Sequence, residues 1–220
     1  GGSATALGSR TDATGTSSTA IGIFAQSTAQ ETIAIGRSAA ASSQRAIAIG
    51  SAPCVASADY AIAVGNDVAV SGQQAVGIGR SAVASGSGSI ALGKFTDATA
   101  VDAVAIGPGS QATGVSSFAG GDGANASGTE AIAIGKGTIS SSQSTIAIGD
   151  QLCTAAAVYA LVLGGNVQAT GIGAVAIGRS ALATFAGATA VGEYTNATAS
   201  NATAIGRGAD GTAAGAVGLG

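Results

Sequence analysis

A glycine recurs every 14 or 15 residues along the whole chain, and this spacing constrains the fold more than any other feature. Sixteen glycines mark the repeat, and thirteen of the fifteen intervals between them are 14 residues long. A fixed period of this kind is typical of solenoids, in which each repeat packs only on its neighbours. The marking glycines are Gly8, Gly22, Gly36, Gly50, Gly65, Gly79, Gly93, Gly107, Gly121, Gly135, Gly149, Gly164, Gly178, Gly192, Gly206 and Gly220.

Each repeat contains two segments in which side-chain types alternate. With the glycine numbered position 14, position 13 is Leu, Ile or Val in fifteen of sixteen repeats, position 11 is mostly aliphatic, and position 12 is Ala in thirteen. This period of two indicates a β-strand, and small residues at positions 3, 5 and 7 indicate a second, shorter one. The sequence therefore predicts an all-β fold, a parallel β-roll (solenoid) of about 15–16 coils of 14–15 residues.

The same alternation predicts which side chains lie inside each coil. We expect the aliphatic side chains of positions 11 and 13 to fill the interior, opposite the small residues of positions 3 and 5. Phe118 and Gly120 occupy positions 11 and 13 of one repeat, which we interpret as volume compensation in that interior. Alanine at position 12 and small residues at position 10 would then form a flat outer face that a second chain can approach closely, which predicts self-association.

The chain also repeats on a longer scale. Both 15-residue coils contain one Cys and one Tyr, and the segment 94–100 matches the segment 193–199 at the same offset of 99 residues. We therefore expect residues 1–220 to form a single β-roll domain that is internally duplicated with a 99-residue offset. The duplicated pairs are Cys54 with Cys153 and Tyr60 with Tyr159.

The two cysteines cannot form a bond with each other if the coils stack as predicted. Seven coils at about 4.8 Å would separate them by about 34 Å, which is too far for a disulfide. If the extra residue of each 15-residue coil lies in its first turn, both cysteines take the inward position 3. We expect buried free thiols, and a bond to the same cysteine of a neighbouring chain is the alternative.

Composition argues against several classes of function. Charged residues make up 9% of the chain and the net charge is −3, so we expect no nucleic-acid partner. The apolar runs are too short to span a bilayer, so no direct membrane insertion by this segment is expected. The chain has no His and no Cys-x-x-Cys motif, and its acidic residues lack metal-loop spacing. We expect no catalytic, cofactor or metal site, and therefore no enzyme.

The candidate contact residues are basic side chains directly after the marking glycines. Six of the eight basic residues occupy position 1, although Asp122, Asp150 and Glu193 take that position in other coils. One interpretation is a solvated corner that also keeps molecules from aggregating, and the other is an array of basic contacts for a host polymer or glycan. The six residues are Arg37, Arg80, Lys94, Lys136, Arg179 and Arg207.

A column of hydroxyl side chains follows the second strand. Position 6 is Ser or Thr in fourteen of fifteen coils, which is typical of a column that satisfies turn backbone. An ice-binding solenoid is a less favoured alternative, because a second regular Thr column is missing at position 4, where Asp12, Gln26 and Val83 occur.

The sequence motif that ends each coil resembles that of a known family. Residues 32–36 (TIAIG), 46–50 (AIAIG) and 174–178 (AVAIG) closely resemble the signature of YadA-like head domains, which belong to the trimeric autotransporter adhesins of Gram-negative bacteria. The resemblance extends over residues 4–220. It implies a left-handed parallel β-roll that assembles side by side as a homotrimer and projects from the cell surface on a stalk anchored in the outer membrane.

The resemblance also implies a function. We expect an adhesive head that binds extracellular matrix proteins, host receptors or cells, other bacteria or abiotic surfaces. No stalk or anchor pattern is visible, so we expect those elements outside these residues. A structural spacer that presents another binding domain of the fibre is the alternative.

Overall fold

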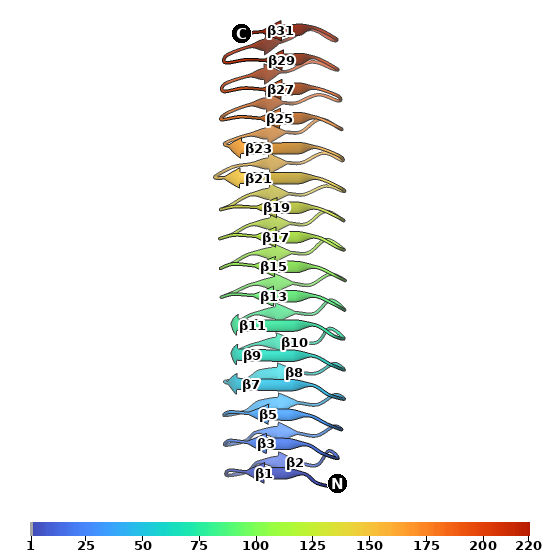
Figure 1. The fold of residues 1–220 in the computed structure, drawn as a ribbon, viewed down its shortest axis with the longest axis vertical. Helices are drawn as coiled ribbons and strands as arrows, with labels where there is room; N and C mark the ends of the chain where they lie inside the picture. Colours follow the sequence, from blue (N-terminus) through green and yellow to red (C-terminus); the bar gives the residue numbers. More distant parts are fainter. Residues whose placement is uncertain (1) are drawn as a thin grey trace. The chain divides into compact units, whose positions relative to one another are not determined.

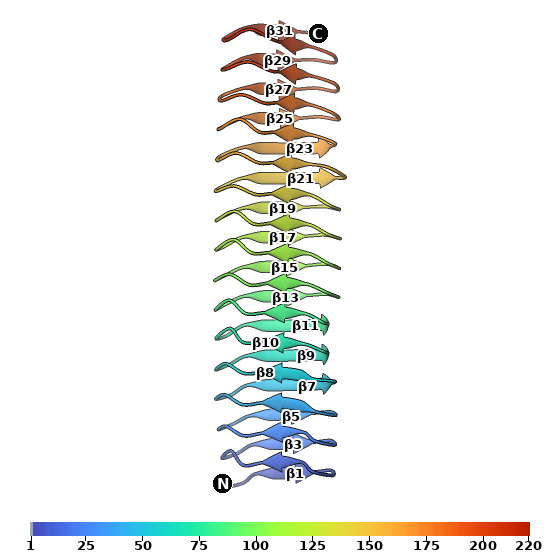
Figure 2. The ribbon, with the colours of Figure 1, turned by 180° about the vertical axis from the view of Figure 1, so that it is seen from behind.

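The chain folds entirely as short β-strands and turns. The computed structural model describes residues 2–220 and divides into two compact units, Gly1–Gly109 (unit 1) and Ser110–Gly220 (unit 2). Within each unit, odd-numbered strands form one parallel sheet (the odd sheet) and even-numbered strands form another (the even sheet), and both follow chain order (Figures 1 and 2). Each unit is described by itself below.

In unit 1 the odd sheet comprises β1 (Thr5–Leu7), β3 (Thr19–Ile21), β5 (Ile33–Ile35), β7 (Ile47–Ser51), β9 (Ile62–Asn66), β11 (Val76–Arg80), β13 (Ile90–Leu92) and β15 (Val104–Ile106). The even sheet comprises β2 (Asp12–Ala13), β4 (Gln26–Ser27), β6 (Ala39–Ala41), β8 (Cys54–Ala56), β10 (Ala69–Val70), β12 (Val83–Ala84) and β14 (Asp97–Ala98).

In unit 2 the odd sheet comprises β17 (Phe118–Gly120), β19 (Ile132–Ile134), β21 (Ile146–Asp150), β23 (Leu161–Gly165), β25 (Val175–Ile177), β27 (Thr189–Val191), β29 (Thr203–Ile205) and β31 (Val217–Leu219). The even sheet comprises β16 (Gln111–Ala112), β18 (Asn125–Ala126), β20 (Ile139–Ser140), β22 (Thr154–Ala155), β24 (Gln168–Ala169), β26 (Leu182–Ala183), β28 (Asn196–Ala197) and β30 (Asp210–Gly211).

Equivalent residues of successive coils pair in register. On the odd sheet Ala34 pairs with Ala48 and Ile35 with Ile49, so each column of side chains repeats one position of the 14-residue pattern. The predicted all-β parallel solenoid with two strands per coil is thereby confirmed. The left-handed sense and the homotrimer stay predictions.

The interior of each coil is lined by alanine, so the prediction that the aliphatic side chains fill it is wrong. Ala34 is fully buried, whereas Ile33 and Ile35 beside it are only half-buried. Positions 3, 5, 10 and 12 point inward, and positions 11 and 13 point outward. The physical reason is the small space between the two sheets of one coil, which admits little more than a methyl group from each side.

One coil shows how tightly this interior is filled. Val68 and Val70 stand at positions 3 and 5, where other coils have smaller residues, and position 12 opposite them is Gly77. A Cβ on Gly77 would lie 2.7 Å from Cγ2 of Val70, which is closer than real contacts allow. The larger valines therefore require a glycine across the coil.

The outward aliphatic side chains form a continuous apolar surface on the odd sheet of each unit, which we call the aliphatic face. Ile49, Ile78 and Leu163 are 38–44% exposed there. Phe118 and Gly120 also lie on this face, so their compensation occurs outside the coil and not in its interior. In unit 1 the aliphatic face consists of Thr5, Leu7, Thr19, Ile21, Ile33, Ile35, Ile47, Ile49, Ile62, Val64, Val76, Ile78, Ile90, Leu92, Val104 and Ile106. In unit 2 it consists of Phe118, Gly120, Ile132, Ile134, Ile146, Ile148, Leu161, Leu163, Val175, Ile177, Thr189, Val191, Thr203, Ile205, Val217 and Leu219.

Sterics explain why glycine closes every coil. Gly36 has φ +122°, a conformation that residues with a side chain rarely adopt. A Cβ at this residue would also lie 1.7 Å from the carbonyl oxygen of Gly50 in the next coil. Buried hydroxyls complete the turns, since Thr32 and Thr195 each donate to the carbonyl three residues earlier (2.7 and 2.9 Å).

Both 15-residue coils place their extra residue in the first turn, which meets the condition under which the cysteines take position 3. Cys54 pairs in register with Ala39, and Thr154 pairs with Ile139, so Cys54 and Cys153 both take position 3. Both thiols are free within the chain and fully buried, which confirms their predicted burial at position 3.

Candidate functional site

The six predicted basic residues all lie at the turn that leads from an odd strand to the next even strand, which we call the first corner (positions 1 and 2 of each coil). Position 2 adopts a left-handed backbone, as at Ser81 (φ 54°) and Phe95 (φ 57°), and this turns the chain across the coil. All six side chains are exposed. Unit 1 carries Arg37, Arg80 and Lys94, and unit 2 carries Lys136, Arg179 and Arg207.

In unit 1 two of these cations flank an exposed aromatic ring. The guanidinium carbon of Arg80 is 4.9 Å from the centroid of the Phe95 ring, and Nζ of Lys94 is 4.8 Å from it. A backbone hydrogen bond from Phe95 to Arg80 (2.8 Å) fixes the two coils in this alignment. Phe95 is 50% exposed, and among residues 2–220 no acidic group forms an ion pair with either cation. The corner therefore presents two unpaired positive charges beside an accessible ring.

In the equivalent corner of unit 2 the cations are paired with an acid. Arg179 and Arg207 both form ion pairs with Glu193, the second at 3.3 Å. Arg179 also lies 5.1 Å from the ring centroid of Tyr194, which is 47% exposed. Lys136, the third basic residue of this unit, stands between coils that have Asp122 and Asp150 at position 1.

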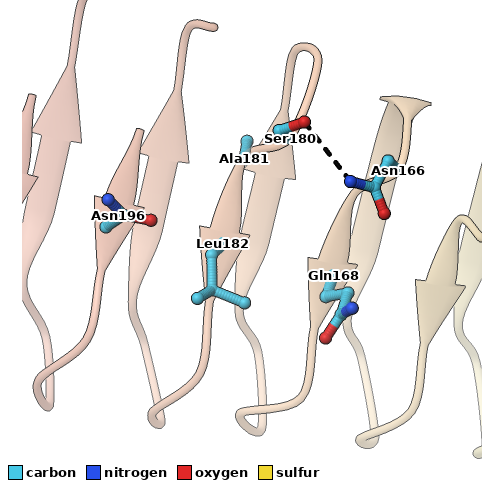
Figure 3. A pocket seen from close by; sticks show the side chains of 6 residues that line it. All are labelled: Asn166, Gln168, Ser180, Ala181, Leu182 and Asn196. Atoms are coloured by element: carbon cyan, nitrogen blue, oxygen red, sulfur yellow. Dashed lines mark hydrogen bonds between the residues drawn. The ribbon is translucent and has the colours of Figure 1, made fainter. Parts of the chain in front are cut away.

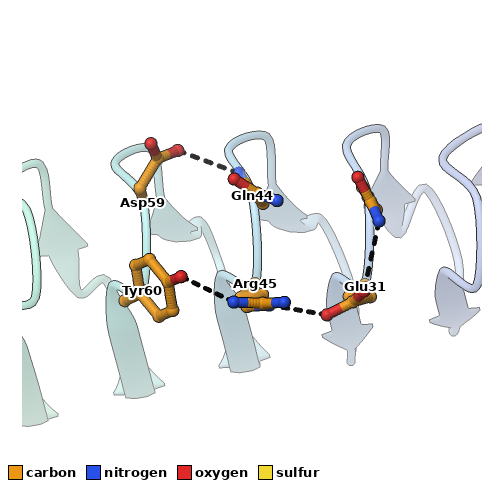
Figure 4. Close-up of polar contacts among 6 residues, drawn as sticks. Glu31, Gln44, Arg45, Asp59 and Tyr60 are labelled. Atoms are coloured by element: carbon orange, nitrogen blue, oxygen red, sulfur yellow. Dashed lines mark hydrogen bonds and ion pairs between the residues drawn. The ribbon is translucent and has the colours of Figure 1, made fainter.

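The turn on the other side of the coils carries a polar network that the sequence analysis missed. At this second corner (positions 8 and 9), Nε of Arg45 donates to Oε2 of Glu31 (2.6 Å), and a second nitrogen of Arg45 donates to the hydroxyl of Tyr60 (2.6 Å), as Figure 4 shows. The hydrogen bond from Arg45 lowers the pKa of the Glu31 carboxyl, and Glu31 in turn raises the pKa of Arg45. Grouping residues by position 9 would have placed all three in one column.

The outer face of the even sheet is mainly polar. The predicted hydroxyl column at position 6 lies on this side and is exposed at Thr14, Ser85 and Thr113. In unit 2 a shallow hollow opens at the border of this face and the first corner, between β24, β26 and β28 (Figure 3). An amide of Asn166 donates to the Ser180 hydroxyl across it (3.4 Å). The hollow is lined by Asn166, Gln168, Ser180, Ala181, Leu182 and Asn196.

The remaining chemistry of the described residues is sparse. Burial raises the pKa of both thiols, Cys54 and Cys153, which lowers their reactivity because the thiolate is the nucleophile. Within residues 2–220, no three His, Cys, Asp or Glu side chains gather in a way that could hold a metal ion. The same residues include no helix with the length and apolarity needed to cross a membrane.

Comparison with known families gives a result that agrees with the repeat. The family model described as "YadA head domain repeat (2 copies)" matches well over half of the chain, at residues 1–25, 27–52, 71–96, 98–124, 126–151, 169–192 and 186–209. The chain belongs to the YadA head domain repeat family. All six predicted basic residues lie in segments that match the YadA head repeat. A search of curated proteins finds no match.

Proposed function

We propose that this chain is the adhesive head of a trimeric autotransporter adhesin, exposed on the surface of a Gram-negative cell. Membership of the YadA head repeat family supports this role. The proposed role is binding and not enzymatic, and its targets are extracellular matrix proteins, host receptors, other bacteria or abiotic surfaces. Three identical chains would present each corner three times, so that several weak contacts add up to firm attachment.

The aliphatic face is the observation that carries the assembly part of the proposal. It consists mainly of aliphatic side chains, with a few Thr residues, Phe118 and Gly120, and no charged residue lies on it in either unit. Soluble proteins rarely expose an apolar surface of this extent unless it contacts a partner. Side-by-side homotrimer formation through this face would bury it, and the contact surface is therefore the aliphatic side of the odd sheet and not the alanine side that the sequence suggested.

The assembly is tested by the mass of the 220-residue chain in solution. We expect sedimentation equilibrium to give a mass near three times the 20.2 kDa of one chain. The result should not change with reductant, because both thiols are buried inside their coils. A stable, folded monomer would contradict the trimer.

Adhesion is tested separately with beads that carry the chain. We expect retention on at least one of collagen, fibronectin and plastic under flow, with beads carrying an unrelated protein as the control. A trimer that is retained on none of these surfaces would favour the spacer alternative.

A further inference from the structure

We propose that the first corner of unit 1, formed by Arg80, Lys94 and Phe95, binds an anionic polysaccharide. This inference deepens the proposed adhesive function and rests on it, because it assigns one class of ligand to one set of residues. The chemistry required is a sulfate or carboxylate group together with the apolar side of a sugar ring.

Neither cation of this corner forms an ion pair within residues 2–220. Arg80 and Lys94 stand in neighbouring coils, which a parallel sheet spaces at about 4.8 Å, and both side chains lie within 5 Å of the Phe95 centroid. An acidic residue, Asp67, stands at position 2 of the preceding coil. It accepts a hydrogen bond from the Ser81 hydroxyl (3.1 Å). It forms no ion pair within the described chain. An anionic group placed between the two cations would relieve their mutual repulsion and receive charge-assisted hydrogen bonds.

The ring provides the second half of the site. Phe95 is half-exposed although it is among the largest apolar side chains in the chain. The two cations hold it beside the place where the anion would bind. An aromatic face next to paired cations suits a sugar that has one apolar side and one charged substituent.

The internal duplication supplies a built-in comparison. At the offset of 99 residues, Arg80 corresponds to Arg179, Phe95 to Tyr194 and Lys94 to Glu193. The cation and the ring are thus kept in both units, and the second cation is replaced by an acid that pairs with Arg179 and Arg207. Position 1 carries three cations and no acid in unit 1, but three cations and three acids in unit 2. The structure therefore assigns the site to unit 1 alone.

A local site for sugars fits the chain better than a surface for nucleic acid or membranes. The net charge is −3 and the isoelectric point is about 4.6, so the chain as a whole does not attract polyanions, and an anionic ligand has to be held by the local contacts of this corner. Two cations beside one ring match a contact with one or two sugars.

The test measures binding of the full 220-residue chain to immobilised heparin, with neutral dextran as the blank and double-stranded DNA as the competing polyanion. We expect wild-type protein to bind heparin in a salt-dependent manner. Lys94→Glu should weaken binding about tenfold or more, because it removes one cation and places an acid beside Arg80, as Glu193 stands beside Arg179. Glu193→Lys should strengthen binding, because it frees Arg179 and Arg207 beside Tyr194.

Lys136→Glu is the matched control. It makes the same change of charge at the same position of a coil, but Gly137 follows it in place of an aromatic residue, so we expect unchanged heparin binding. Circular dichroism confirms folding of each variant, and the chain itself accommodates both Lys and Glu at this position.

Three results would overturn the inference: no heparin binding by wild type, equal loss in the Lys94→Glu and Lys136→Glu variants, or DNA binding as tight as heparin binding through the same residues. The bead assay on collagen, fibronectin and plastic distinguishes failure of the proposed sugar site from failure of the proposed adhesive function. Beads that adhere without heparin binding contradict the sugar site alone, and heparin binding by a non-adhesive monomer contradicts the adhesin assembly alone.

Discussion

The ring of Phe118 occupies the space that a side chain at residue 120 would need, since a Cβ on Gly120 would lie 2.7 Å from Cε1 of Phe118. Both residues point outward from β17 onto the aliphatic face. In the next coil they pair in register with Ile132 and Ile134. One large side chain and one missing side chain thus replace two of medium size, and the two positions should behave as a unit.

A double-mutant cycle tests this coupling. We expect Gly120→Ile alone to destabilise the protein by about 1–3 kcal/mol, because the ring must be displaced. Adding Phe118→Ile gives this coil the same two isoleucines as the neighbouring coil. The double variant should therefore recover most of the lost stability. Urea unfolding of the two single variants and the double variant measures the interaction, and additivity within about 0.5 kcal/mol would show that the residues are independent.

Two isoleucines of nearly equal exposure, one on the aliphatic face and one outside it, provide a matched test of that face as the contact surface. Ile134 lies on that face with 39% exposure, and Ile139 lies on the outer side of the even sheet with 38% exposure. We expect Ile134→Asp to convert the proposed trimer to monomer, since a charge would be buried without a partner. Ile139→Asp should leave the mass in sedimentation equilibrium unchanged. Loss of the trimer in both variants, or in neither, would rule out the aliphatic face as the contact surface.

The sequence predicted two strands per coil and their parallel pairing, because glycine spacing and alternation depend only on the local chain. It did not predict which side of the odd strand faces inward. Alternation separates two faces without identifying them, and the usual preference for large apolar residues inside failed here. The deciding quantity is the distance between the two sheets of one coil. The sequence contains one indication that this distance is small, because position 12 is Gly77 and not Ala in the coil where Val68 and Val70 stand opposite it.

The candidate site was predicted in part for a similar reason. Position 1 grouped the basic residues into one column, and all of them are exposed at the first corner. The partner residues escaped notice because each belongs to another position: Phe95 stands at position 2, and Arg45 with Glu31 stands at position 9. The contact of Phe95 with Arg80 emerges only when positions 1 and 2 of neighbouring coils are compared, whereas the Glu31–Arg45 contact lies within the single column of position 9.

The Glu31–Arg45 pair predicts a titration that can be followed directly. Arg45 donates to Glu31 and lowers the pKa of its carboxyl, so Glu31 should stay ionised to a lower pH than an ordinary glutamate. In the Arg45→Ala variant its pKa should return towards the ordinary value of about 4.3. Carboxyl chemical shifts from NMR report both values. Identical titration of Glu31 in both proteins would show that the pair does not persist in solution.

The buried thiols predict a loss of stability at alkaline pH. Burial raises the pKa of Cys54 and Cys153 in the folded chain, whereas in the unfolded chain both titrate near about 8.5. Above that pH the unfolded state loses protons that the folded state retains. The free energy of unfolding is therefore fully maintained below about pH 8.5 and should fall above it, by at most about 1.4 kcal/mol per pH unit for each thiol.

The matched variant replaces both cysteines with alanine, the residue that Ala39 and Ala82 show to fit at position 3. Urea unfolding of wild type and of Cys54→Ala/Cys153→Ala between about pH 8 and about pH 9.5 isolates the contribution of the thiols, because the two proteins differ in no other titratable group. We expect the slope of stability against pH to flatten in the variant. Equal slopes would mean that the thiols ionise as readily in the folded coils as in the unfolded chain, and would contradict their burial at position 3.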